Sequence, residues 1–272
     1  MGIITRKPRN PSLRFQTFLD SSDITRKSPE PSLVVGLKKK GGRNAYGRIT
    51  VRHHGGGASQ RYRIIDFKRS EHGIPGVITT VEYDPNRNVR IALVVYRNGA
   101  KKYVLLPVGL RVGDTIISGL DAEAKVGNAT TIRNIPAGFE IHNIEIEPGS
   151  GGKLVRSAGL AAQIMGKSDT HATLKMPSGE IRMFLLDCWA TVGTLGNADF
   201  KNITWGKAGR TRNRGIRPTV RGMAMNPVDH PHGGGEGRSK SGSHPTTPWG
   251  KGCKGTRTRR RKNPLILRRR KK

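Results

Sequence analysis

The residues best suited to chemistry lie in one glycine-rich segment near the end of the chain, residues 225–239. It contains His230 and His232 beside the carboxylates of Asp229 and Glu236. His230 and a carboxylate could act as an acid/base pair, because histidine titrates near neutral pH and a carboxylate can orient its ring. The two histidines could instead bind zinc. A third interpretation is an RNA clamp, in which the imidazoles contact phosphates or 2′-hydroxyl groups and the glycines permit close approach.

Neither zinc binding nor catalysis finds support in the rest of the sequence. A structural zinc site needs four ligands, and Cys188 and Cys253 do not form a C-x-x-C pair. Catalysis needs a pocket shielded from water, which a glycine-rich segment has only if RNA builds it. We expect a buried or half-buried thiol at Cys188, and Cys253 has no histidine placed to activate it. The sequence therefore predicts an RNA-packed loop without catalytic residue, metal or cofactor.

Two further segments combine glycine with arginine, residues 41–57 and 206–222. In the first, glycine permits close approach to phosphates, arginine binds them bidentately, and Tyr46, His53 and His54 can stack on unpaired bases. The alternative is a solvated basic loop. A nucleotide-binding P-loop is excluded, because Gly-Lys-Ser/Thr does not follow the triple glycine. The second segment has an arginine every two or three residues, which suits an extended chain along phosphates, and its Gly and Pro disfavour a helix.

These segments lie in the parts of the chain that carry its positive charge. The 272 residues include 50 Lys and Arg against 19 Asp and Glu, a net charge of +31. Residues 1–60 contribute +9, residues 61–200 only +3, and residues 201–272 +19. Positive charges at this density repel one another, so we expect a polyanion as the partner. Nucleic acid is such a polyanion, because its phosphates are closely spaced.

The sequence gives no sign of a membrane partner. It has no apolar run long enough to span a bilayer, and its first residues lack the apolar core of a signal peptide. The chain has only two cysteines, so no network of disulfide bonds is expected, and this is consistent with a reducing compartment. We therefore expect a cytoplasmic protein.

The nearly neutral middle of the chain predicts its folded part. Alternating apolar residues over 89–95 predict a strand with one buried face, between strands at 77–83 and 102–106, and Asn98-Gly99 is a hairpin signal. Short strands separated by turns are typical of small β-barrels, so the expected fold class is mainly β. Further strands are expected over residues 138–146, 161–165, 172–176 and 181–186, with a break between two barrels near 119–130.

Four parts follow from this pattern. We expect a basic N-terminal extension over residues 1–59, one barrel over 60–122, a second over 123–200 and a basic Gly/Arg-rich C-terminal extension over 201–272. The extensions should lack regular structure, because they have little apolar surface whose burial could offset the entropy of ordering. They should become ordered on RNA.

Residues 225–238 read Met-Asn-Pro-Val-Asp-His-Pro-His-Gly-Gly-Gly-Glu-Gly-Arg, which resembles the signature of the universal family of large-subunit ribosomal protein two, bacterial type. The resemblance runs from about residue 40 to the C-terminus. The other segments that agree with the family, in the same order, lie at 42–50, 62–69, 82–87, 133–136, 142–143, 156–159, 217–222 and 245–250.

A DNA-packaging protein is an alternative interpretation of the basic ends. Such a protein would have no use for two barrels and the histidine segment.

This resemblance implies an OB-fold barrel followed by an SH3-like barrel, with extensions that penetrate ribosomal RNA. It implies direct, early binding to large-subunit ribosomal RNA, contact with small-subunit RNA at an intersubunit bridge, and neighbouring ribosomal proteins as partners. It also implies support for subunit association, tRNA binding and peptide-bond formation near the peptidyl transferase centre. The family's matching histidine, here His230, is a disputed catalytic candidate, and we expect no enzyme. The ribosome would lie in a bacterial cytoplasm or in an organelle stroma.

The sequence departs from the family pattern at three places. Ala58 and Ser59 replace a His-Lys pair, which removes a positive charge. Asn213 replaces a tryptophan, which removes a stacking side chain, and Trp189 replaces the arginine after Cys188. Charge, motifs and resemblance together select the residues expected to contact RNA: Arg43, Asn44, Arg48, Arg52, His53, His54, Arg63, Lys68, Arg69, Arg87, Arg156, Lys207, Arg210, Arg212, Arg214, Arg217, Arg221, Asn226, His230, His232, Arg238, Arg257, Arg259 and Arg268.

Overall fold

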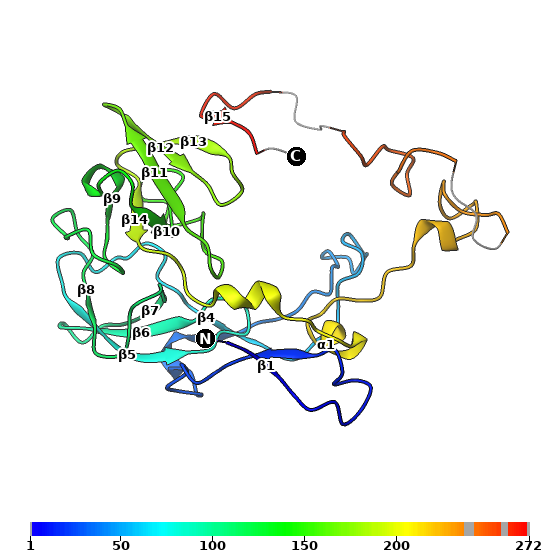
Figure 1. Cartoon of the computed structure of the whole chain (residues 1–272), viewed down its shortest axis with the longest axis horizontal. Helices are drawn as coiled ribbons and strands as arrows, with labels where there is room; N and C mark the ends of the chain where they lie inside the picture. The colour runs from blue at the N-terminus through cyan, green and yellow to red at the C-terminus, as the bar shows by residue number, and fades with distance from the viewer. Residues whose placement is uncertain (1, 237–241, 257–260, 271–272) are drawn as a thin grey trace. The chain divides into compact units, whose positions relative to one another are not determined.

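In a computed structural model, which describes residues 2–236, 242–256 and 261–270, the chain forms two compact units (Figure 1). The barrel unit comprises Met1–Lys38, Ser59–Lys207 and Pro264–Lys272. The loop unit comprises Lys39–Ala58 and Ala208–Asn263. Most regular structure is β, which confirms the predicted fold class. The fourfold division of the chain stays a prediction.

The first sheet of the barrel unit is an antiparallel meander of three strands, and a short fourth strand crosses over to pair with the first of them. Its three predicted strands are confirmed to within about two residues at each end. Asn98-Gly99 forms the expected hairpin turn, with Gly99 at φ +82°. In the order β7-β6-β5-β8, the strands are Lys101–Leu105, Ile91–Tyr96, Gly76–Glu82 and Thr115–Ile116.

The central strand β6 is buried on both faces, so the prediction of one buried face was wrong. Ile91 and Leu93 pack into a cluster with Tyr103. Ala92 and Val94, which point to the other face, pack into a second cluster. The strand separates two small cores because the sheet curls and the chain covers both of its sides. Hydrophobic residues therefore occupy consecutive positions rather than alternate ones.

The second sheet of the barrel unit has seven strands. The strands expected over 138–146, 161–165, 172–176 and 181–186 are confirmed, the first only over three residues. Three strands were not predicted, because each has only three or four residues and pairs with a partner distant in sequence. In the order β15-β13-β12-β11-β10-β14-β9, the strands are Ile266–Arg268, Ile181–Leu185, His171–Lys175, Ala162–Lys167, Glu140–His142, Trp189–Val192 and Ala129–Thr131.

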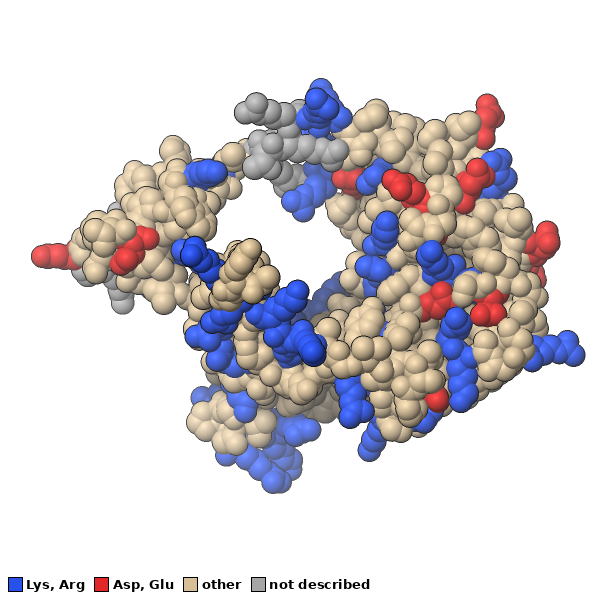
Figure 2. Space-filling view, turned by 180° about the vertical axis from the view of Figure 1, so that it is seen from behind, with Lys and Arg blue, Asp and Glu red and all other residues tan. Residues whose placement is uncertain are grey.

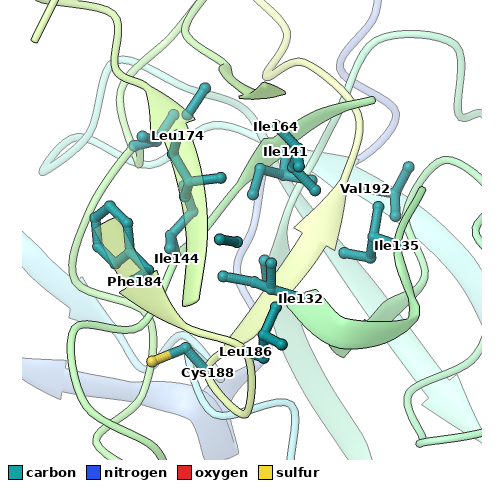
Figure 3. Packing of buried hydrophobic residues seen from close by; sticks show 14 residues of the cluster. Ile132, Ile135, Ile141, Ile144, Ile164, Leu174, Phe184, Leu186, Cys188 and Val192 are labelled. Atoms are coloured by element: carbon teal, nitrogen blue, oxygen red, sulfur yellow. The ribbon is translucent and has the colours of Figure 1, made fainter. Parts of the chain in front are cut away.

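The largest hydrophobic core lies inside this second sheet (Figure 3). Ile141, Ile164 and Leu174 have no exposed surface, and Phe184 closes the cluster. Cys188 belongs to the same core, as expected for a buried thiol. Burial, and then the nearby carboxylate of Glu145, raises the pKa of its thiol to about 11. The thiol is therefore a packing group rather than a nucleophile.

The prediction that the extensions lack regular structure needs correction at several short elements. The N-terminal residues are tied to the barrel unit by the carboxylate of Asp23, which accepts a hydrogen bond of 2.9 Å from the buried guanidinium of Arg90. A buried charge needs such a partner, and this requirement orders the segment around it. The strands involved pair as β1 (Ile3–Thr5) with β2 (Thr17–Leu19) and β3 (Val34–Gly36) with β4 (Arg61–Arg63), and β15 joins the second sheet. The extensions also contain the α-helix α1 (Ala208–Asn213) and the 3-10 turns Pro31–Leu33 and Gly222–Ala224. Two more 3-10 turns, Ile132–Asn134 and Ala198–Asn202, lie in or beside the second barrel.

Burial of His142 in β10 makes the stability of the barrel unit depend on pH. Its Nδ1–H donates a hydrogen bond of 2.7 Å to the carbonyl oxygen of Gly193. Burial lowers the pKa of this histidine from 6.5 to about 4. Between these values the unfolded chain binds a proton that the folded chain does not, so stability rises with pH through this window and is lost as pH falls through it.

We predict that His142→Gln removes a pH dependence on the order of 1 kcal/mol per pH unit between pH 6.5 and about 4. The measurement is the free energy of unfolding in urea at several pH values. His171→Gln in β12 of the same sheet is the matched control and should keep the dependence. Equal pH profiles for the wild-type chain and His142→Gln would contradict the prediction.

Candidate nucleic-acid interface

The barrel unit carries a basic groove of about 500 Å³. Lys68, Lys102, Lys153 and Arg156 line it, together with Phe67 and the single carboxylate of Asp66. The guanidinium of Arg156 lies 4.4 Å from the centre of this ring. Four cations beside an aromatic ring can hold phosphates and stack on a base.

Arg87 stands next to this groove and is held in place by several partners. Its guanidinium lies 5.3 Å from the centre of the Phe67 ring. It donates hydrogen bonds to the Asp84 carboxylate at 3.2 Å and to the Tyr62 hydroxyl at 3.0 Å. These contacts preorganise the guanidinium, but the pairing with Asp84 also balances part of its charge.

Arg63 and Arg69 are buried, and both donate hydrogen bonds to other groups of the barrel unit. Arg69 donates to the Ser118 hydroxyl and to the Gly127 carbonyl, both at 3.0 Å. Burial lowers the pKa of its guanidinium. Arg63 donates to the Arg61 carbonyl at 3.1 Å. Arg69 thus connects the end of the first sheet to the start of the second.

The two Gly/Arg motifs, far apart in the sequence, pair with each other in the loop unit. The amide of Gly55 donates to the Gly215 carbonyl, and the amide of Ala58 donates to the Asn213 carbonyl, both at 2.9 Å. The amide of Arg217 donates to the His53 carbonyl at 3.0 Å. Here the glycines bring backbone against backbone. This is a different use from the expected close approach to phosphate.

Within the first motif, Asn44 fixes a tight turn. Its side-chain oxygen accepts the amides of Tyr46 and Arg48, each at 3.0 Å. Tyr46 is thereby held at the tip of the turn with 89% of its surface exposed. Arg43, Arg48 and Arg52 are also exposed around it. An exposed aromatic ring among arginines is an arrangement that can stack on an unpaired base.

The expectation of an extended second motif was wrong over Ala208–Asn213, which forms the helix α1. Ala and Arg are good helix formers, and the helix ends shortly before Gly215 at φ +86°. The rest of the motif is irregular, apart from a 3-10 turn at Gly222–Ala224. The motif's arginines beyond the helix, Arg214, Arg217 and Arg221, are exposed.

The histidine segment folds into a compact loop around His230, which is buried with 8% of its surface exposed. Its Nδ1 accepts the amide of His232 at 3.0 Å, and the two rings pack edge to face. A Cβ atom at Gly222 would overlap the His230 ring, so only glycine fits there. In the described residues neither Asp229 nor Glu236 is hydrogen-bonded to this histidine. The acid/base geometry is therefore not formed.

The remaining candidates lie in varied surroundings. Lys207 and Asn226 are exposed, and so is Arg268 in β15. His54 forms an isolated β-bridge with Ile216. Arg210 and Arg212 belong to α1 and are partly buried. Three other candidates, Arg238, Arg257 and Arg259, lie outside the described residues.

Sequence reasoning missed Phe67, Lys102 and Lys153 as parts of the basic groove. They come from three loops and strands that only the folded barrel brings together. Phe67 had a usable signal, since this aromatic residue directly precedes the candidates Lys68 and Arg69. The two lysines carried no local signal.

Charge is distributed differently over the two units. Figure 2 shows acidic side chains interspersed with basic ones over the visible face of the barrel unit. The loop unit's segments contain five Lys and Arg in residues 39–58 and 14 in residues 208–263, against two acidic residues. Its excess positive charge therefore requires an external anion.

Two other kinds of site are absent from the described ranges. No helix there has the length and apolarity needed to cross a membrane. No group of three or more His, Cys, Asp and Glu side chains there is placed to hold a metal ion.

Two protein-family models match the chain. Residues 30–118 match the model for the RNA-binding N-terminal domain of ribosomal proteins L2. Residues 125–250 match the model for the C-terminal domain of ribosomal proteins L2. The two matches follow one another in the expected order and together cover most of the chain.

We predict that Gly57→Ala opens the pairing between the two Gly/Arg motifs. Gly57 has φ +85°, and an added Cβ would lie 2.7 Å from the backbone nitrogen of Gly215. The amides of Gly55 and Ala58 should then exchange their hydrogens faster, as measured by hydrogen–deuterium exchange. Gly47→Ala is the matched control, because it has φ +75° and open space around it. Equal effects of both variants would show that backbone strain, rather than close packing, is decisive.

Proposed function

The chain belongs to the ribosomal protein L2 family, a family of structural ribosomal proteins, and from this premise we propose its particular role. It binds large-subunit ribosomal RNA directly and early, and it supports assembly of the subunit. It contacts small-subunit RNA at an intersubunit bridge. Its C-terminal part supports tRNA binding and peptide-bond formation near the peptidyl transferase centre. Its place is the ribosome of a cytoplasm or an organelle stroma, beside other ribosomal proteins.

The observation that carries the RNA-binding role is the set of exposed arginines in the loop unit. Arg43, Arg48, Arg52, Arg217 and Arg221 are exposed, and in the described residues none of them is paired with a carboxylate. Backbone pairing joins the two motifs that carry these cations into one unit. Such an arrangement is stabilised by phosphates, which neutralise several guanidinium groups together.

The barrel unit supplies a rigid platform with a second contact surface. Its basic groove presents Lys68, Arg156 and the neighbouring Arg87 beside Phe67. The proposed contact set keeps the predicted residues at the surface, together with Lys102 and Lys153. Arg63 and Arg69 instead support the barrel from inside, since both are buried. His230 orders the loop that presents its exposed neighbours Asn226 and Val228.

The first test is the salt dependence of binding to ribosomal RNA. If about ten phosphates of a single-strand-like RNA are neutralised, the logarithm of affinity should fall with the logarithm of salt concentration with a slope on the order of −7. Arg48→Gln should reduce the slope by about one. Arg97→Gln, an exposed arginine of the first barrel outside the contact set, is the control. Salt-insensitive binding, or equal competition by duplex DNA, would contradict the proposal.

The second test separates structural support from catalysis at His230. Because this ring is buried and bonded within its loop, His230→Gln should impair assembly or tRNA placement. The rate of peptide-bond formation in fully assembled ribosomes should stay near normal. A catalytic histidine predicts instead a loss of about a hundredfold in that rate. Single-turnover kinetics on purified, fully assembled particles distinguish the two outcomes.

A further inference from the structure

A second groove of the barrel unit differs from the basic groove in the charge of its lining. It measures about 1110 Å³, and residues of both barrels line it. Its wall includes the segment that joins the two sheets, from Gly119 to Glu123, and Trp189 of β14. We call it the acidic groove.

Aromatic and aliphatic side chains form the apolar part of the acidic groove. The rings of His72 and Trp189 pack against each other, with centres 4.7 Å apart and planes inclined by 41°. Leu120 has 60% of its surface exposed at the same place. A leucine so exposed beside a tryptophan offers apolar surface to a partner.

The charge of the acidic groove is unlike that of most of this chain. Its charged lining residues are Asp121, Glu123 and Lys125, so carboxylates outnumber cations there. Asp121 and Glu123 line the groove, and Lys125 balances only Glu123, at 2.7 Å. Asp121 is exposed and has no ion pair in the part of the chain that the structure describes. The unpaired carboxylate of Asp121 favours a cationic ligand over a phosphate at this place.

We propose that the acidic groove docks an extended, Lys/Arg-rich segment of a neighbouring ribosomal protein. Its ribosomal setting follows from the family, and the docking itself does not depend on the proposed RNA contacts. An apolar side chain of the segment would cover Leu120 and the ring pair. An adjacent arginine would lie over the Trp189 ring and pair with the Asp121 carboxylate. Charge complementarity and exposed apolar surface thus select the same kind of partner.

A photocrosslinking amino acid at position 120, in purified large subunits, tests the proposal. The expected product joins it to a Lys/Arg-rich peptide of another ribosomal protein, identified by mass spectrometry. Asp121→Lys should reduce this product several-fold, whereas Asp169→Lys, on an exposed turn of the second barrel, should not. A crosslinker at Val108, exposed outside the groove, gives the background.

Three outcomes would overturn the docking proposal: a crosslink to ribosomal RNA, a crosslink to the chain's own residues, or a yield no higher than at position 108. Incorporation of the variants into the large subunit is scored separately by sedimentation. A chain that incorporates normally but crosslinks to RNA refutes the docking site and leaves the proposed RNA binding intact. A chain that does not enter the subunit even without the crosslinker counts against the proposed function instead.

Discussion

The loop unit has to hold many arginines close together although it contains almost no carboxylates. Backbone hydrogen bonds hold the unit together: they join two glycine-containing segments, which meet at Gly57 and Gly215. Backbone pairing does not depend on the charges of the side chains, so it persists beside cations that repel one another. The cost of this repulsion remains until an anion removes it. The unit is therefore built to be completed by a polyanion.

In the barrel unit, by contrast, several arginines have partners within the fold. Arg90 is paired with Asp23, and Arg87 is partly balanced by Asp84. Arg69 has a hydroxyl and a carbonyl as partners instead of a carboxylate. These partners lie within the fold of the unit, which also packs a core on each side of β6. The basic groove and the acidic groove are then local features of the folded barrels, whose residues 61–200 carry a net charge of only +3.

Much of this architecture could be predicted, and the failures have physical causes. Strands with strong apolar patterns, such as β5 and β7, were located to within about two residues. The strands β9, β14 and β15 were missed, because three or four residues carry little pattern and their partners lie far away in sequence. The helix α1 was missed because the surrounding glycine and proline outweighed a short run of good helix formers. The basic groove was only half predicted, since Lys102 and Lys153 join it through the fold alone.

The sequence by itself determined the charge of the chain, its division between the ends and the middle, the mainly β pattern and the family. These properties follow from residue types and short spacings, which are local. Only the tertiary structure decided which of the predicted residues reach the surface. It buries Arg69 and His230, exposes Tyr46, and joins two motifs that lie more than a hundred residues apart. Burial and backbone pairing depend on contacts between distant segments, and no local pattern of residues specifies them.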